Sequence, residues 1–211
     1  MQITILGSAG QIGKIVVAEA IKMGYRVKVL VRNPDKLGEL KDKVDIVQGN
    51  LLDPLSVEKA LAGSKAVINL SGAVKEPNQI EKFQKIGEIL VEKMKQQGIT
   101  RLVNISLAVI PLPLEKLDMQ RKALRVFVNL FYKQKKRVQE TVMGVILKAK
   151  DLSWTLVRPA MVSKKPGTGI ILASDIHMPG TTIMVEDLAK FMVEQIMSTE
   201  WIKKAPLVAS K

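Results

Sequence analysis

Short apolar runs alternate with longer segments of helical spacing along the chain. Runs of strand character, rich in β-branched residues, occupy residues 3–6, 26–31, 44–49, 66–72, 101–106 and 154–160. Apolar residues at helical spacing occupy residues 13–24, 55–63, 80–98 and a long stretch from about 115 to 150. Strands separated by helices predict right-handed crossovers and a parallel sheet covered on both faces. The predicted fold class is therefore α/β, with a doubly wound parallel sheet.

The size of the chain fits one domain. Its 211 residues, 47% of them hydrophobic, suffice for a buried core, with room for a small appended lobe as the alternative. No apolar run reaches the roughly 18 residues that a membrane span requires. The first strand-like run starts too close to Met1 for a signal peptide to precede it. We therefore expect a single domain over residues 1–211, no membrane span and a cytoplasmic location.

Cysteine and histidine are too scarce for several kinds of site. The chain has no cysteine, which excludes a disulfide framework, a thiolate metal site and a cysteine nucleophile. His177 is the single histidine, so we expect no metal site. The surrounding stretch, SDIHMPGTT, is typical of a turn, and an acid–base role for His177 is the less favoured interpretation.

The chain carries a net charge of +13, and much of the excess lies between residues 116 and 150. Such a charge suits nucleic acid, an anionic membrane or a phosphate-rich ligand. This segment lacks a series of stacking aromatic residues, however, and contains no nucleic-acid-binding motif. We therefore interpret it as a solvated helix face and keep an anionic macromolecule as the alternative.

Three glycines at intervals of three residues follow the first strand-like run. Gly7, Gly10 and Gly13 lie where the chain changes from strand to helix, at the carboxyl edge of the predicted sheet. Glycine allows the main chain to approach a diphosphate closely, and the next helix offers unpaired N–H groups and partial positive charge. In this context the GxxGxxG spacing predicts a dinucleotide site. The alternative is a purely structural turn.

The end of the second strand-like run predicts which dinucleotide binds. An NAD site usually has Asp or Glu there, about 20 residues past the glycines. This chain has Arg32 instead, with Lys36 one helical turn further on. A guanidinium group can bind a 2′-phosphate, which a carboxylate would repel, so NADP(H) is the predicted cofactor. A surface arginine and lysine without a ligand are the alternative.

Two later turns fit the same cofactor. Asn50 and Leu51 follow the third strand-like run, where an amide could bond the adenine edge and a leucine could pack on its face. Ser71 and Gly72 end the fourth run and let the chain pass near the ribose. Asp53, by contrast, is predicted to cap a helix whose first residue is Pro54.

Several of these segments together resemble a known family. The resemblance rests on ITILGSAGQIGK, VLVRNPDKL, VQGNLLD, AVINLSGA, LSWTLVRPAMV, TGIILASD and IMVEDLAKFMVEQI. They are similar to the atypical short-chain dehydrogenases of the NAD(P)H-binding, NmrA-like group, close in layout to the flavin reductase that also reduces biliverdin. The resemblance covers residue 2 to about 205. It implies one Rossmann-like domain with an exposed nicotinamide, in a cleft that the segment from about 159 to 211 completes.

The resemblance also implies a set of cofactor contacts. By position, they fall on Gly7, Ser8, Gly10, Gln11, Ile12, Gly13, Arg32, Lys36, Asn50, Leu51, Ser71, Gly72, Ile105 and Ser106. In the flavin-reductase relatives a serine follows the residue matching Ser106 and a histidine lies just after the proline of the RP pair. This chain has Leu107 and Met161 there, so the proton-donating pair is missing. A flavin or quinone can still accept hydride while solvent supplies the proton.

Tyr132 and Lys136 are the other candidates for acid chemistry. Their YxxxK spacing is that of ordinary short-chain dehydrogenases, and one helical turn would bring the ammonium group close enough to activate the phenol. A solvated, lysine-rich helix explains the same residues. In addition, Leu107 replaces the serine that normally completes this set.

Two functions remain open after these observations. The preferred one is an NADPH-dependent reductase that passes hydride to a flavin, quinone or similar conjugated acceptor bound under the 107–120 loop. The alternative is a catalytically weak NADP(H)-binding sensor or assembly factor that acts through a macromolecular partner. Met161, Met178 and Met184 could line a pocket for a planar ring or pack as ordinary core residues. A monomer or a dimer is expected.

Overall fold

The computed structural model describes residues 1–72 and 78–211, and its strands β1 to β6 form the predicted parallel sheet. Within these residues one eight-stranded sheet has the order β3-β2-β1-β4-β5-β6-β10-β8. Its first six strands along the chain are β1 (Gln2–Leu6), β2 (Arg26–Val31), β3 (Asp45–Gln48), β4 (Ala66–Asn69), β5 (Arg101–Ile105) and β6 (Ser153–Pro159). Neighbouring strands are parallel as far as β10 (Leu207–Ser210), and β8 (Ile171–Ser174) closes the edge antiparallel to it.

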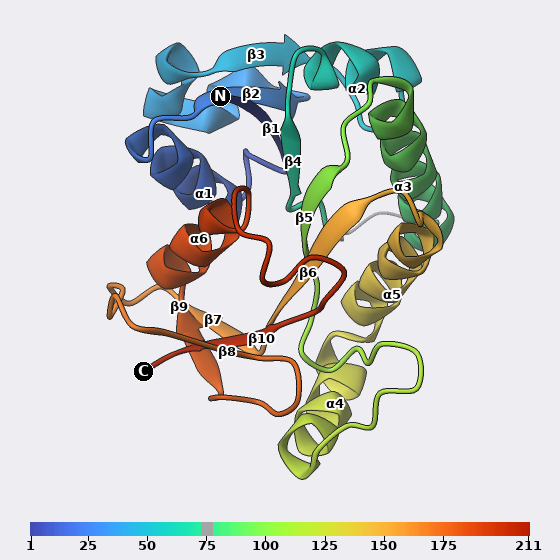
Figure 1. Ribbon diagram of the computed structural model, residues 1–211, viewed down its shortest axis with the longest axis vertical. Helices are drawn as coiled ribbons and strands as arrows, with labels where there is room; N and C mark the ends of the chain where they lie inside the picture. Colours follow the sequence, from blue (N-terminus) through green and yellow to red (C-terminus); the bar gives the residue numbers. More distant parts are fainter. Residues whose placement is uncertain (73–77) are drawn as a thin grey trace.

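Helices cover both faces of the sheet (Figure 1). One face carries α1 (Gln11–Lys22) and α6 (Val185–Glu194). The other carries α2 (Pro54–Leu61), α3 (Gln79–Gln96) and α5 (Lys133–Lys148). Along β1, Ile3 and Ile5 belong to the core under α1 and α6, whereas Leu6 belongs to the core under α2 and α3. All three are fully buried, as expected for a sheet enclosed on both faces.

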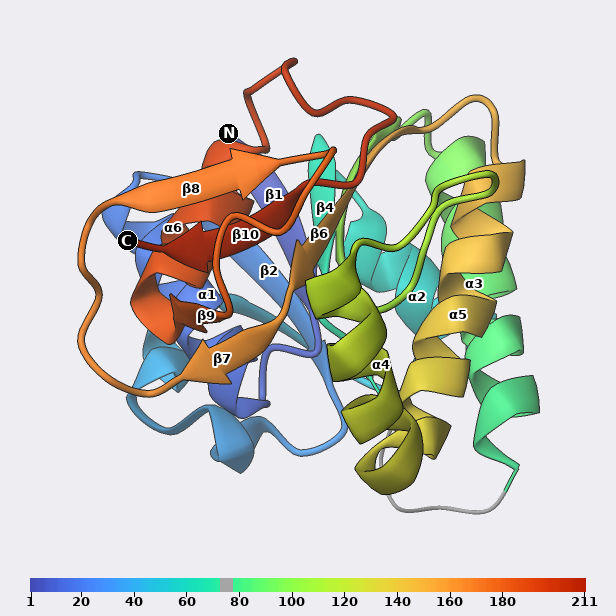
Figure 2. The ribbon, with the colours of Figure 1, turned by 90° about the horizontal axis from the view of Figure 1, so that it is seen from below.

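The stretch predicted to be helical from about 115 to 150 is two helices rather than one. It contains α4 (Met119–Phe131) and α5, and the chain leaves helical geometry at Tyr132, where φ is −134° and ψ is 24°. Apolar and basic residues continue at helical spacing through this break, so the sequence pattern gave no sign of it. Figure 2 shows α4 next to the start of α5.

Backbone contacts close the turn between β1 and α1. Gly7 has a φ of +79°, and a Cβ at this position would lie 2.7 Å from the carbonyl carbon of Leu70, which follows β4. A Cβ on Gly13 would lie 2.2 Å from the carbonyl oxygen of Gly7. The helix, the turn and the neighbouring strand therefore approach one another at distances that only glycine permits.

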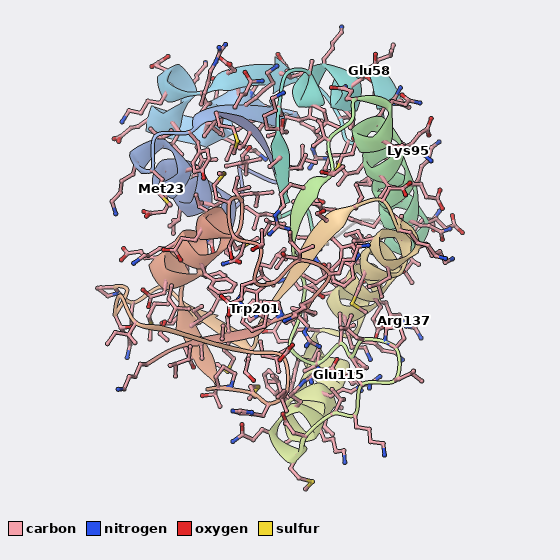
Figure 3. The ribbon with its side chains drawn as sticks, viewed as in Figure 1. Met23, Glu58, Lys95, Glu115, Arg137 and Trp201 are labelled. Atoms are coloured by element: carbon pink, nitrogen blue, oxygen red, sulfur yellow. The ribbon has the colours of Figure 1, made fainter. Side chains whose placement is uncertain are left out.

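A buried ion cluster holds the loop before α4 against β6. Glu115 Oε1 lies 2.5 Å from Arg121 Nη1, and Glu115 Oε2 lies 2.6 Å from Arg158 Nη1. The two guanidinium groups also donate to the carbonyl oxygens of Ala108 and Ala205. Arg158 thus pairs with both backbone and a carboxylate. Figure 3 labels Glu115 beside α4.

The pKa of Glu115 reflects two opposing influences. Burial raises the pKa of this carboxyl group, but hydrogen bonds from Arg158 and Arg121 lower it by more. The net result is a pKa below the usual 4.5. Because folding lowers this pKa, the ionised Glu115 stabilises the native state above the unfolded-state pKa, and that stabilisation is lost as the pH falls through the folded-state pKa.

Glu115→Gln should lower the free energy of unfolding by about 3 kcal/mol near neutral pH, because it leaves two buried guanidinium groups without a counter-charge. Urea unfolding of wild type and variant should show this difference shrinking as the pH falls below 4.5. Glu200→Gln, an exposed control, should change stability by less than about 0.5 kcal/mol. Equal effects of the two substitutions would contradict a stabilising role for the cluster.

Gly13→Ala should destabilise the protein by about 2 kcal/mol or more, because its methyl group would overlap the carbonyl oxygen of Gly7. Gly144→Ala in α5 is the matched control, since no heavy atom lies within 4 Å of the added Cβ. This control should be neutral or stabilising by up to about 1 kcal/mol. Thermal and urea unfolding measure both, and equal stability of the two variants would disprove the close contact.

Candidate functional site

The carboxyl ends of β1, β4 and β5 meet where the strand order reverses. β1 pairs with β2 on one side and with β4 on the other. Leu6 is in register with Asn69, and Asn69 with Asn104, so the turns that follow these three strands lie side by side (Figure 1). Ligands of open parallel sheets bind at such a switch point.

The first turn of α1 faces this point without a side-chain cap. Gly10 is the N-cap residue, with φ −74° and ψ 165°, and it offers no side-chain hydrogen bond. The first turn contains no acidic residue. Gln11 is exposed there and Ile12 is half-buried. The partial positive charge and N–H groups of this helix end are therefore not occupied by a capping side chain, which is the arrangement of an anion site.

Two serine hydroxyl groups near this turn are buried without a hydrogen-bond partner among the described residues. Ser8 follows Gly7 and Ser106 follows β5, and each is at most 1% exposed. A buried hydroxyl group without a partner costs stability. A polar ligand at the switch point would supply the missing partner, so these groups fit a dinucleotide better than an empty structural turn.

A buried amide network lies beneath the same turns, and the sequence analysis missed it. Asn69 Nδ2 donates to Asn104 Oδ1 at 2.7 Å, and Ser71 Oγ donates to Asn69 Oδ1 at 2.6 Å. The network fixes the end of β4 against the end of β5. Its signal was present in the chain, because Asn-Leu-Ser at 69–71 and Asn-Ile-Ser at 104–106 repeat one pattern at two adjacent strand ends.

Two cations lie at the end of β2. Arg32 directly follows that strand, and Lys36 lies in the 3-10 helix η1 (Pro34–Lys43); both are exposed. Asn33 accepts a hydrogen bond from the Asp35 backbone N–H at 2.9 Å and so begins η1. The Asp35 carboxylate is paired with Lys41 at 2.8 Å, and that hydrogen bond lowers the pKa of Asp35. The negative charge of Asp35 is thus neutralised by Lys41.

The remaining predicted contacts occupy three neighbouring turns. Asn50 is exposed, and its Oδ1 accepts a hydrogen bond from the Leu52 backbone N–H at 3.0 Å. Leu51 packs against the core under α2 and α3. Gly72 lies beside the buried Gln139, whose Nε2 is 3.4 Å from an added Gly72 Cβ. Asp53 caps α2, with Pro54 as its first residue, as predicted.

Tyr132 and Lys136 are one turn apart in the backbone, but their side chains do not meet as a pair. The Lys136 ammonium group donates to Asn129 Oδ1 at 2.6 Å. The Tyr132 ring is half exposed, and the cation over it is Lys135, 6.0 Å from its centroid. The structure therefore does not assemble the predicted phenol–ammonium pair.

The residues that the sequence analysis considered for the acceptor side are apolar. Leu107 packs against the core under α2 and α3, and Met161 is exposed at the start of β7 (Met161–Ser163), which pairs with β9 (Thr182–Met184). Met178 is buried with Ala108 and Leu207, as in ordinary core packing. None of these residues offers a proton.

The part of the chain that the structure describes contains no group of three acidic or histidine residues arranged to hold a metal ion. His177 lies on the surface, where its backbone N–H donates to Ser174 Oγ. Across the same described residues, no helix combines the length and the apolar character that crossing a bilayer requires.

Comparisons with known proteins agree with this geometry. Photosystem II assembly factor Ycf39 of Guillardia theta is 35% identical over 109 residues, which cover 50% of this chain and 35% of that protein. The chain thus spans about a third of the length of this curated relative. A short-chain dehydrogenase/reductase of Veillonella parvula, solved in complex with NADP, gives a TM-score of 0.78 at 17% identity, over 99% of this chain and 94% of its own.

A Streptococcus pneumoniae protein named as a candidate NADH-flavin reductase gives a TM-score of 0.79 at 22% identity, with both chains covered in full. These structural likenesses confirm the predicted Rossmann-like fold. A family model described as NAD(P)H-binding matches residues 7–199, which is most of the chain. The protein therefore belongs to this NAD(P)H-binding family.

Proposed function

We propose that the protein is an NADPH-dependent oxidoreductase that reduces a flavin, a quinone or a similar conjugated acceptor. The observation that carries this proposal is the uncapped first turn of α1 at the switch point, beside the unpaired hydroxyl groups of Ser8 and Ser106. NADPH, when bound, supplies the hydride. Residues of this chain hold it, orient it and leave its reactive face open.

The glycine turn would bind the diphosphate. Gly7 and Gly13 set the close approach of β1, β4 and α1, and Gly10 keeps the helix N-terminus clear of side-chain atoms. The backbone N–H groups of Gln11 and Ile12 then face the phosphate oxygens with the favourable end of the helix dipole behind them. Ser8 and Ser106 donate their buried hydroxyl groups to the same ligand.

Arg32 and Lys36 would bind the 2′-phosphate. Both extend from the end of β2, where an NAD site has a carboxylate instead. A phosphate there gains charge-assisted hydrogen bonds from the guanidinium group of Arg32. The pairing of Asp35 with Lys41 keeps its negative charge from opposing this contact.

The rest of the cofactor would follow the neighbouring turns. We assign the adenine ring to Asn50 and Leu51, and the ribose and nicotinamide to Ser71, Gly72 and Ile105. On the acceptor side, the segment from about 159 to 211 would complete the cleft as part of the one domain. Because Leu107 and Met161 cannot donate a proton, the best substrates are conjugated rings that take hydride while solvent supplies the proton.

A catalytically weak NADP(H)-binding sensor or assembly factor is the second candidate function. Two observations favour it: Leu107 and Met161 stand where the flavin-reductase relatives have a serine and a histidine, and half of the chain is similar to a protein named as a photosystem II assembly factor. Both functions require the same cofactor site. Only a measurement of NADPH turnover distinguishes the two functions.

Arg32→Ala should weaken NADPH binding by about tenfold to a hundredfold and leave NADH binding unchanged, because it removes charge-assisted hydrogen bonds to the 2′-phosphate alone. Titration calorimetry of the purified protein measures both. Arg26→Ala is the matched control, since Arg26 begins the same strand at its far end and is paired with Asp45 at 3.0 Å. Equal losses for NADPH and NADH would refute the phosphate contact.

Wild-type protein should oxidise NADPH in the presence of a flavin or a quinone, measured by absorbance under steady-state conditions. Tyr132→Phe should keep at least about half of that rate, because the ring is exposed and unpaired with Lys136. NADPH binding without oxidation by any acceptor of a flavin and quinone panel would favour the sensor function. A roughly hundredfold lower rate of NADPH oxidation in Tyr132→Phe would instead indicate that Tyr132 takes part in catalysis.

A further inference from the structure

Helix α4 carries apolar residues on two opposite faces. Its inner face contributes Leu124 and Val128 to the core, together with the buried Arg121. Its outer face, defined here as Met119, Val126, Phe127, Leu130 and Phe131, is exposed. Leu130 is 73% exposed and Phe131 67%. These exposed apolar side chains lie along one helix, beside polar positions such as Lys122 and Arg125, and an exposed apolar patch of this kind is typical of a binding surface.

The outer face ends in a cluster of aromatic rings. The Phe127 and Phe131 ring centroids are 4.9 Å apart, and the Tyr132 ring lies 6.0 Å from that of Phe127. Tyr132, which lies between α4 and α5, combines an apolar ring with a polar hydroxyl group. Aromatic residues with this combination favour the boundary between an apolar phase and water.

Cations outnumber carboxylates along α4 and the start of α5. Between Asp118, which caps α4, and Glu140, the chain contains seven lysines and arginines and no acidic residue; two of the seven, Arg121 and Lys136, are buried. A groove of about 460 Å³ runs beside α4, and Lys116, Lys122 and Arg125 are among its lining residues. Glu115 also lines it, but this carboxylate is bound by two buried arginines. The groove therefore presents cations to a ligand.

We propose that the outer face of α4 binds the surface of an anionic lipid bilayer. Phe127, Leu130 and Phe131 enter the boundary between headgroups and acyl chains, while the surrounding lysines and arginines contact the lipid phosphates. The 13 residues of α4 lie along the bilayer rather than across it. Figure 1 shows α4 at the end of the molecule opposite β1 and β2.

A second copy of the chain fits this surface less well. In a twofold dimer each patch faces the same patch of its partner, so the cations around α4 would oppose one another. In the sequence from Met119 to Gln139 no acidic residue is present to compensate them. An anionic bilayer instead provides an apolar interior for the aromatic and aliphatic side chains and negative charge for the lysines and arginines.

Vesicle sedimentation tests the proposal with the full-length protein. Binding should be strong to vesicles of phosphatidylcholine mixed with phosphatidylglycerol, weak to phosphatidylcholine alone, and reduced by added salt. Leu130→Ser combined with Phe131→Ser should weaken binding by about tenfold or more. Ile176→Ser combined with Met197→Ser, two exposed apolar residues elsewhere, should bind like wild type. Neither pair changes the net charge.

A second measurement reports insertion directly. A Phe127→Trp variant should show a blue-shifted emission on anionic vesicles and quenching by brominated acyl chains. The proposal would be overturned by unchanged emission, or by vesicle binding that persists in the Leu130→Ser and Phe131→Ser double variant. Either result would mean that vesicle binding, if any, is purely electrostatic and involves no insertion of the outer face. Absence of vesicle binding, with a dimer that the same pair dissociates, would assign the outer face to a second copy. Capture by an acidic protein without vesicle binding would also overturn it.

Discussion

The structure depends on the contact of three pieces of backbone at one point. Gly7 lies against the chain that follows β4, and Gly13 lies against the carbonyl group of Gly7, each closer than a Cβ would permit. This contact brings the N-terminus of α1 to the switch point of the sheet, where strand ends on both sides open toward a ligand. The proposed anion site would therefore be made by backbone geometry.

The two sides of the site are built in different ways. On the cofactor side, the buried amides of Asn69 and Asn104 hold the strand ends, and no side chain caps α1. On the acceptor side, the loop before α4 is held by Glu115 between two arginines. This ion cluster also anchors α4, so the cationic and apolar surface of α4 and the proposed acceptor cleft share one structural support. Removing that support would disturb both.

Local patterns in the sequence were sufficient for strands β1 to β6 and for the glycine turn, but not for β8 and β10. The apolar runs located β1 to β6, and the glycine spacing located the turn, because these signals arise within a few residues. Tyr132 shows the limit: the helical spacing continues through it, and only the backbone reveals the break. The Glu115 cluster joins residues 43 positions apart, which no local pattern encodes. The direction of the Lys136 side chain likewise depends on Asn129, a residue that the YxxxK spacing ignores.

Hydrogen–deuterium exchange with and without nucleotide would test the central claim most directly. NADPH should protect the amides of residues 7–13, 32–36, 69–72 and 105–106 together, because one ligand would span the turns after β1, β2, β4 and β5. NADH should protect the same turns except 32–36, where the 2′-phosphate contact is missing. Absence of protection at 7–13, or protection confined to the region around α4, would contradict a dinucleotide site at the switch point.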